Sequence, residues 1–280
     1  MREINVSKIR DTVTELCLKA NFELRRDILK ALKTAFKMET DPRAKNILKA
    51  IIENAVLAKK KHIAICQDTG FVSVFIELGR SVLLSGGDLS EAVHKGVEDA
   101  YKRGYLRKSI VNDVLTRKNT NTNTPSIIHI DIVDGDKIKI SVSAKGFGSE
   151  NKSAIKMLKP TACDKDIIDF VTEVVKRAGP DACPPYVLGV GLGGTFDHAA
   201  HLSKRALLRS VESGNSKRHF RRLEKDILKA VNSLKIGPMG LGGKTTALGV
   251  NVEEFPTHIA GLPVAVTVSC HATRSAEKTI

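Results

Sequence analysis

Three of the five cysteines lie where a predicted element ends, which is where a side chain can reach a shared binding site. Cys66 follows an apolar run, ending at Ile65, that we expect to be a strand. Cys183 lies in a short loop with three prolines, and Cys270 follows a β-branched strand and precedes His271. Thiolates brought together from such distant segments can bind Zn²⁺ or an iron–sulfur cluster.

The pattern around these cysteines favours a cluster over a structural zinc. The chain has no Cys-x-x-Cys pair, whereas a cysteine followed by proline, as at Cys183, is typical of cluster ligands. Three cysteine ligands would leave one iron of a four-iron cluster open as a Lewis acid. The alternative is three ordinary buried cysteines, because their separations in the sequence are large. Cys17 is expected to be a small apolar residue inside a helix, and Cys163 lies just before another helix.

The composition indicates a reduced, globular chain with a strong positive charge. Its 280 residues are 42% hydrophobic, which suffices for a large core, and five cysteines are too few for a disulfide scaffold. Because there is no membrane-spanning segment and no apolar signal segment, we expect a cytoplasmic protein without a membrane partner. The net charge of +14 could suit a nucleic acid, an anionic substrate or an acidic subunit. An aromatic content of 4% without tryptophan disfavours the nucleic acid.

Periodic apolar residues predict helices throughout residues 1–60. Ile9, Val13 and Leu16 share one helical face, and Asp41 followed by Pro42 is a strong signal for the start of a helix. We therefore predict a mainly helical N-terminal layer at 1–60 that packs on a mixed α/β body formed by 61–280. The fold class is mixed α/β (α+β). No long linker or repeat interrupts the chain, so we expect a single domain over residues 1–280.

Strand and helix signals alternate through the body. The turn signal Asp134-Gly135 separates two alternating apolar runs, at 128–132 and 138–142, which predicts that these two strands form a β-hairpin. The remaining expected elements are strands at 71–76 and 263–269 and helices from Asp88 to near Gly104, over 164–177, after Thr195 and after Ser216.

Two glycine-rich segments resemble nucleotide-binding motifs. Residues 189–194 satisfy G-x-G-x-x-G, and Glu212 lies near the place of a ribose-binding acid, so an NAD-dependent oxidoreductase is an alternative. Against it, these glycines follow Cys-Pro-Pro rather than a clear first strand. Residues 237–245 are not a P-loop, because Pro238 takes the place of the first glycine and has no N–H to donate to a phosphate. We predict a glycine-rich turn that leads into a strand.

Several motifs, in order along nearly the whole chain, resemble the α-subunit of class I fumarate hydratases and L-tartrate dehydratases. This resemblance implies a fold of the iron–sulfur hydro-lyase type. The matching segments are residues 66–70, 144–152, 179–185, 191–195, 240–246 and 268–272.

The resemblance implies a role for each matching residue. Cys66, Cys183 and Cys270 would bind a [4Fe–4S] cluster through three cysteine ligands, leaving one open iron for the substrate. Phe147 departs from the family's usual run of three glycines. From residue type alone, Arg107 could equally be a solvated charge and His258 a structural histidine. The other implied residues are Asp68 as the acid/base group, Gln67 in the substrate pocket, Arg107 on a substrate carboxylate, Gly146 and Gly148 as backbone donors, and His258 near the substrate hydroxyl.

The implied reaction is reversible removal of water from a 2-hydroxy dicarboxylate. Our main expectation is conversion of (S)-malate to fumarate in the tricarboxylic acid cycle, and the alternative is an L-tartrate dehydratase α-subunit. In the resembling family, further catalytic residues come from a C-terminal domain that this chain lacks. We therefore expect a separate β-subunit, an α2β2 or similar assembly, and turnover only in the complex.

Overall fold

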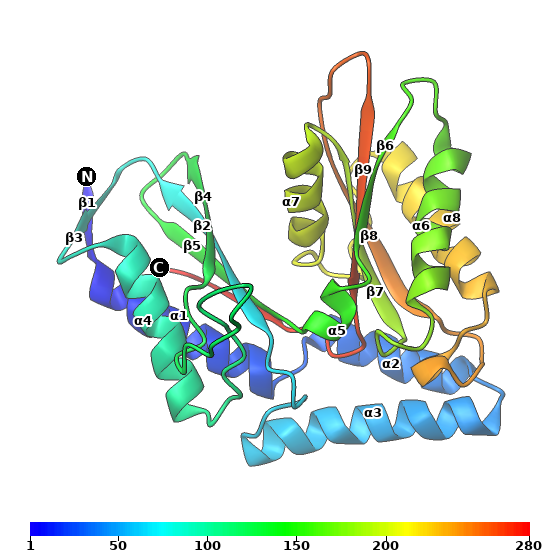
Figure 1. Ribbon diagram of the computed structural model, residues 1–280, viewed down its shortest axis with the longest axis horizontal. Coiled ribbons are helices and arrows are strands. Elements are labelled where there is room, and N and C mark those ends of the chain that lie inside the picture. The colour runs from blue at the N-terminus through cyan, green and yellow to red at the C-terminus, as the bar shows by residue number, and fades with distance from the viewer. The chain divides into compact units, whose positions relative to one another are not determined.

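The structure is a computed structural model that describes residues 1–280, and it divides into two compact units. Unit 1 comprises Met1–Arg25, Ala55–Phe147 and Arg274–Ile280, and unit 2 comprises Arg26–Asn54 and Gly148–Thr273 (Figure 1). Each unit combines helices with a four-stranded sheet, which confirms the mixed α/β fold class. The single domain stays a prediction. None of the helices has the length and apolar character that crossing a bilayer requires.

Unit 1 is a sheet packed against two helices. Its elements are β1 (Arg2–Asn5), α1 (Val6–Phe22), β2 (Phe71–Gly79), β3 (Val82–Ser85), α4 (Leu89–Arg103), β4 (Ile127–Val133), β5 (Ile138–Lys145) and β10 (Ser275–Thr279). The sheet has the order β10–β5–β2–β4, and β1 pairs with β3 separately. Helices α1 and α4 pack on each other, and Val13 of α1 joins Val74 of β2 and Ile140 of β5 in one fully buried core.

The predicted hairpin is wrong, although both of its strands exist. Strand β2 lies between β4 and β5, parallel to the first and antiparallel to the second. The turn at Gly135 therefore connects two strands across the end of β2, where the N–H of Gly79 donates to the carbonyl of Lys137 at 2.9 Å. A side chain at Gly79 would lie 2.6 Å from the Gly135 oxygen, so this crossing requires glycine. The apolar strand β2 occupies the central place of the sheet, and five of its nine residues are buried.

Unit 2 has three layers. Its elements are α2 (Arg26–Met38), β6 (Ala154–Leu158), α6 (Asp164–Ala178), β7 (Tyr186–Gly193), α7 (Phe196–Ala206), α8 (Arg218–Ser233), the 3-10 turn η1 (Pro238–Gly240), β8 (Ala247–Phe255) and β9 (Leu262–Ser269). Helices α3 (Pro42–Lys61) and α5 (Phe147–Glu150) each belong in part to both units. The sheet has the order β6–β9–β7–β8, with α7 on one face and α6 and α8 on the other (Figure 1).

The glycines of the G-x-G-x-x-G pattern lie inside β7 and not in a phosphate-binding loop. Gly189 and Gly191 face α7, and a Cβ there would lie 2.0 and 2.1 Å from the carbonyl oxygens of Ser203 and Ala199. They are needed because the helix packs directly on the strand. Glu212 forms an ion pair with Lys30 at 2.5 Å. These positions remove the structural basis for the dinucleotide-binding alternative.

The predicted helix signals are confirmed. Asp41 accepts hydrogen bonds from the N–H groups of Arg43 and Ala44 at 2.8 and 3.1 Å, and α3 begins at Pro42. Asp88 caps α4 by accepting from the N–H of Glu91 at 2.8 Å. The glycine-rich turn before β8 is also as expected. Local cap chemistry thus sets where these elements begin.

Candidate functional site

Cys66 lies in an irregular loop of unit 1, and the strand expected before it is absent. The N–H of Ile65 donates to the carbonyl of Asn21, at the end of α1, at 2.9 Å, so this backbone bonds to a helix end instead of to a neighbouring strand. Cys66 is half-buried. The loop presents Gln67 and Asp68 directly after the thiol.

The carboxylate of Asp68 joins the two segments of unit 1 that the sequence predicted to form the site. Its Oδ1 accepts from the N–H of Gly70 at 3.0 Å, and its Oδ2 accepts from the N–H of Phe147 at 2.8 Å. Each oxygen keeps a second lone pair. Asp68 therefore fixes the loop around Gly146 while it can still accept a proton or a further hydrogen bond.

The close approach of this loop requires glycine at 146 but not at 147. A Cβ on Gly146 would lie 2.8 Å from Asp68 Oδ2, whereas the Phe147 side chain is 48% exposed. Phe147 contributes its backbone N–H, and its ring lies 6.2 Å from that of Phe71. The departure from the glycine run therefore leaves the backbone donor in place. Gly148 has no neighbour closer than 3.9 Å at its Cβ position.

Arg107 lies beside Gln67. Its Nη1 donates to Gln67 Oε1 at 3.0 Å, and its carbonyl accepts from the Thr69 hydroxyl at 2.7 Å. Arg107 is exposed, and it forms no ion pair with a carboxylate of this chain. Unit 1 thus brings Gln67, Asp68, Arg107 and Gly146 to one loop cluster, with a cation free to meet an anionic ligand.

Two buried polar residues, Tyr101 and Arg274, lie beside this loop cluster. The sequence analysis did not single them out. The Tyr101 hydroxyl donates to the carbonyls of Thr69 and Gly70, at 2.6 and 3.1 Å, and burial raises the pKa of Tyr101 above its ordinary value. Arg274 is 3% exposed, and its Nη2 lies 3.4 Å from the Cβ position of Gly146. In the sequence, Tyr101 could not be distinguished from the apolar core residues of its helix. Arg274 could have been singled out from the sequence, because it follows the predicted ligand Cys270 by four residues.

Cys183 and Cys270 lie close together at one end of the sheet of unit 2. The N–H of His271 donates to the Cys183 carbonyl at 3.2 Å, and His271 Nδ1 lies 3.1 Å from the same oxygen. The Thr273 hydroxyl donates to the Cys270 carbonyl at 2.9 Å. Burial raises the pKa of Tyr186, and the two nearby thiols add to that shift. The Cys183 loop and the segment after β9 are therefore held together.

The loop of Cys183 has a strained and well-supported backbone. Cys183 has a φ of 54°, in the left-handed region that residues other than glycine rarely adopt. The N–H of Met239, in η1, donates to the Pro184 carbonyl at 2.8 Å. Gly240 packs on Pro180, where a Cβ would lie 2.3 Å from the proline Cβ. The glycine-rich turn thus supports the cysteine loop.

The cysteines differ in environment as the sequence suggested. None forms a disulfide, Cys66, Cys183 and Cys270 are half-buried, and Cys163 is exposed. Cys17 is fully buried, and burial raises the pKa of its thiol to about 12. No group of three or more histidine, cysteine or acidic side chains is arranged within the chain to hold a metal ion. Cys66 belongs to unit 1 and the other two candidate ligands to unit 2.

His258 is not brought to the two cysteines of its own unit. It lies in the loop before β9, whereas Cys270 follows that strand, and an eight-residue strand is roughly 26 Å long. The His258 side chain is exposed, and its Nδ1 accepts from the N–H of Ala260 at 3.2 Å. Within unit 2, His258 thus has a local turn-stabilising contact.

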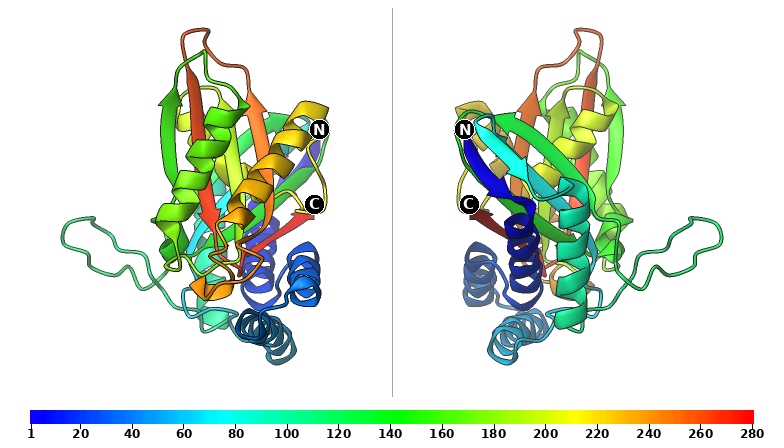
Figure 2. Two further views of the ribbon diagram at one scale, coloured as in Figure 1. Left: turned by 90° about the vertical axis from the view of Figure 1, so that its right-hand side faces the viewer. Right: turned by 90° about the vertical axis from the view of Figure 1, so that its left-hand side faces the viewer.

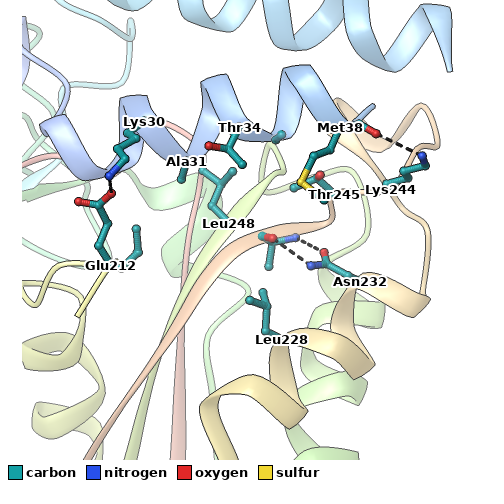
Figure 3. A pocket seen from close by; sticks show the side chains of 13 residues that line it. Lys30, Ala31, Thr34, Met38, Glu212, Leu228, Asn232, Lys244, Thr245 and Leu248 are labelled. Carbon is teal, nitrogen blue, oxygen red and sulfur yellow. Dashed lines mark hydrogen bonds and ion pairs between the residues drawn. The ribbon is translucent and has the colours of Figure 1, made fainter. Parts of the chain in front are cut away.

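A cavity of about 330 Å³ in unit 2 contains none of the predicted site residues (Figure 3). It lies between α2, α8 and the start of β8, with Leu228 among its apolar walls. The Lys30–Glu212 ion pair closes one end. At the other end Lys244 Nζ donates to the Met38 carbonyl at 3.2 Å (Figure 3). Because its charged groups already have partners, this cavity offers no evident chemistry.

Comparison with known proteins decides the family. The model of the fumarate hydratase (Fumerase) family matches residues 10–279, which is nearly the whole chain. The chain belongs to this family. The resemblance inferred from the cysteine segments is confirmed, and the protein is an enzyme of the hydro-lyase class.

Curated members of the family match over most of their length. A protein of Methanocaldococcus jannaschii, provisionally named L(+)-tartrate dehydratase subunit alpha, is 42% identical over 279 residues, 98% of each chain. The L(+)-tartrate dehydratase subunit alpha of Escherichia coli K12 is 30% identical over 272 residues, 96% of this chain and 89% of the relative. The protein of the same name from Shigella boydii matches to the same extent.

Proposed function

We propose that this chain is the α-subunit of a two-subunit hydro-lyase that converts L(+)-tartrate to oxaloacetate. Membership of the family and the names of the full-length relatives support tartrate over the malate that the sequence analysis favoured. The observation that carries the site is the cluster in unit 1, where Asp68 binds the backbone at Phe147 and Gln67 binds Arg107. Malate–fumarate interconversion is the second candidate, favoured by the description of the family model.

The chemistry and the loop positions of three cysteines support the iron–sulfur cluster that we propose. Cys66, Cys183 and Cys270 lie in loops, form no disulfide and are neither fully buried nor fully exposed, and two of their loops are joined through His271. These three residues would hold a [4Fe–4S] cluster. When bound, the cluster supplies a Lewis-acidic iron with an open position for the substrate hydroxyl and carboxylate.

The reaction removes one proton and one hydroxide from neighbouring carbons. A base takes the proton on the carbon next to one carboxylate, the C–H electron pair becomes the second bond of a C=C, and the C–O bond to the departing hydroxyl breaks. The hydroxide leaves as water after it gains a proton. From tartrate the product is an enol, which rearranges to oxaloacetate, and from malate it is fumarate.

Asp68 is the proton acceptor that we propose for this chain. Its two hydrogen bonds to backbone N–H groups hold the carboxylate in one orientation, and each oxygen retains a free lone pair. A carboxylate held in this way can take a proton with little reorganisation. The additional residues that the reaction needs would come from a separate β-subunit in an α2β2 or similar assembly.

Arg107 would bind the second carboxylate of the substrate. A guanidinium offers two parallel N–H groups that match a carboxylate, and Arg107 donates to Gln67 through Nη1, which orients the group. The loop at Gly146 would allow a substrate carboxylate to approach the backbone. The role of His258 near the substrate hydroxyl stays a prediction, and within unit 2 strand β9 separates His258 from Cys270.

The test is anaerobic co-expression with the separate β-subunit, followed by assays on L(+)-tartrate, (S)-malate and fumarate. We expect oxaloacetate from tartrate at a kcat/KM above that for malate, and no turnover by the chain alone. A preference for malate would favour the second candidate. A complex that forms and turns over none of the three would contradict both.

A further inference from the structure

A long arm extends from unit 1, and its outer part, residues 112–119, does not pack on the unit. Residues 108–125 connect the end of the α4 region to β4, and Figure 2 shows this segment projecting from the sheet and helices of its unit. All side chains of residues 112–119 are exposed. Connections of this length are uncommon in compact domains and are usually functional.

The arm is an irregular loop that doubles back on itself and is held by its own hydrogen bonds. Val111 and Asn119 form an antiparallel bridge, and the N–H of Asn112 donates to the Lys118 carbonyl at 2.8 Å. At the tip, Asp113 Oδ1 accepts from the N–H groups of Leu115 and Thr116 at 2.9 and 2.6 Å. The tip therefore has a defined turn although nothing covers it.

The tip exposes two large apolar side chains. Val114 is 78% exposed and Leu115 is 86% exposed, and both lie in the turn that Asp113 caps. Adjacent apolar residues on a pre-ordered turn lose little conformational entropy on binding, which is the property of a docking element. Single exposed apolar residues are common on surfaces, but two adjacent ones at the exposed tip of a projecting arm are not.

The positive charge of the arm indicates which kind of partner it can bind. Lys108, Arg117 and Lys118 are exposed and form no ion pair, and Asp113 is the only acid in the arm. The whole chain has a net charge of +14, which favours an acidic partner at this surface over a second copy. A partner with an acidic rim around an apolar depression would complement the arm.

The base of the arm joins the candidate site. Asn123 is fully buried, its Nδ2 donates to the Gly70 carbonyl at 3.2 Å, and its Oδ1 accepts from the N–H of Ser109 at 2.7 Å. The Thr69 hydroxyl donates to the carbonyl of Arg107, directly before the arm. A partner that holds the arm would also hold the segment between Asp68 and Gly70.

We propose that residues 108–125 dock the separate β-subunit, with Val114 and Leu115 inserted into an apolar depression that has an acidic rim. This inference rests on the two-subunit assembly of the proposed function. It specifies the surface of this chain that makes the contact. It also specifies the apolar and acidic character of the β-subunit surface that binds it. Docking there would order the substrate-binding side of the site when the complex forms.

The experiment measures the affinity of the full chain for the purified β-subunit by isothermal titration calorimetry. The double variant Val114→Ser/Leu115→Ser should raise Kd by about tenfold or more, because buried apolar residues at the centre of an interface carry most of its energy. The control Ile132→Ser changes an equally exposed apolar residue, 76% exposed, on β4 and should leave Kd unchanged. Equal melting temperatures of all three chains would show that the fold is intact.

A second pair of variants tests the charge. Arg117→Glu/Lys118→Glu should weaken binding and reduce its dependence on salt, whereas Lys60→Glu/Lys61→Glu, with the same change in net charge at the end of α3, should not. Unchanged affinity of the tip variant, or no complex at all, would overturn the proposal. So would a tip variant that only dissociates a dimer of this chain. Normal assembly without turnover would contradict the proposed function alone.

Discussion

The carboxylate of Asp68 accepts a hydrogen bond from the backbone N–H of Phe147 at 2.8 Å, although 79 positions separate the two residues. This bond explains how an aromatic residue can stand in a loop where the resemblance implied glycine. The contact uses only the backbone of Phe147, and the side chain points outward, 48% exposed. Position 146 is the one that requires glycine, because its α-carbon faces the same carboxylate oxygen.

Replacing Asp68 with Asn should abolish turnover of the complex while iron binding persists. The amide nitrogen cannot accept a hydrogen bond, so one of the bonds from Gly70 and Phe147 is lost, and with it the proton acceptor. We expect kcat to fall by about 10²-fold or more. The measurement is a steady-state assay beside iron quantification. Asp134→Asn, which alters an exposed acid paired with Arg80, is the control. Wild-type kcat in Asp68→Asn would remove its proposed role.

Gly146→Ala and Gly148→Ala form a matched pair for stability. The new methyl group at 146 would lie 2.8 Å from Asp68 Oδ2, whereas at 148 the nearest atom is 3.9 Å away. We expect Gly146→Ala to lower the free energy of unfolding by about 1–3 kcal/mol. Gly148→Ala, within the short helix α5, should be neutral or slightly stabilising. Thermal and denaturant unfolding of both variants would check this, and equal stabilities would contradict the packing described for the loop.

Arg107→Lys should raise the KM for the dicarboxylate more than it lowers kcat. A lysine ammonium keeps the charge but loses the bidentate geometry and the orientation given by Gln67 Oε1. We expect KM to rise by about tenfold, because the substitution removes binding energy that the substrate and the transition state share. Arg103→Lys, at the end of α4, serves as the matched control. A KM equal to that of the unmodified complex would show that Arg107 does not meet the substrate.

Glu39 should make the stability of unit 2 depend on pH in the acid range. Burial opposes its ionisation, but the N–H groups of Asp41, Lys244 and Thr40 outweigh burial and lower the pKa of Glu39 below its ordinary value of 4.5. A lowered pKa stabilises the folded state above pH 4.5, and this contribution is lost as the pH falls through the lowered value.

The variant Glu39→Gln isolates this contribution. It should be less stable than the unmodified chain at neutral pH, by about 1–3 kcal/mol, and the difference should shrink as the pH falls below 4.5. Glu53→Gln, which alters an exposed i,i+4 ion pair, should show little difference at any pH. Urea unfolding from neutral to acid pH measures both. A constant difference across that range would mean that Glu39 does not titrate as described.

The sequence predicted elements better than their pairing. Helix starts at Asp41 and Asp88 depend on a few neighbouring residues, so local chemistry was sufficient to find them. The hairpin at Asp134-Gly135 failed because the partner of both strands, β2, comes from a distant part of the chain. The run before Cys66 was too short to distinguish a strand from an extended loop that bonds to Asn21.

The residues of the candidate site could also be predicted only in part. The cysteine segments and the Gln67-Asp68 pair could be singled out, because cysteine with Pro or Gly neighbours carries chemical information. The hydrogen bonds of Tyr101 to Thr69 and Gly70 could not be predicted, since a buried tyrosine on a helix reads as an ordinary core residue. Nor could the sequence show that β9 lies between His258 and Cys270.

Iron content of the anaerobically prepared chain tests the central claim most directly. If thiols of both units share one centre, the unmodified chain should bind about four irons, and Cys66→Ser, Cys183→Ser and Cys270→Ser should each lose most of them. The exposed Cys163, replaced by Ser, should keep the full content. A Cys66→Ser chain that retained all of its iron would contradict the account, because the cluster would then be held by unit 2 without the loop that carries Asp68.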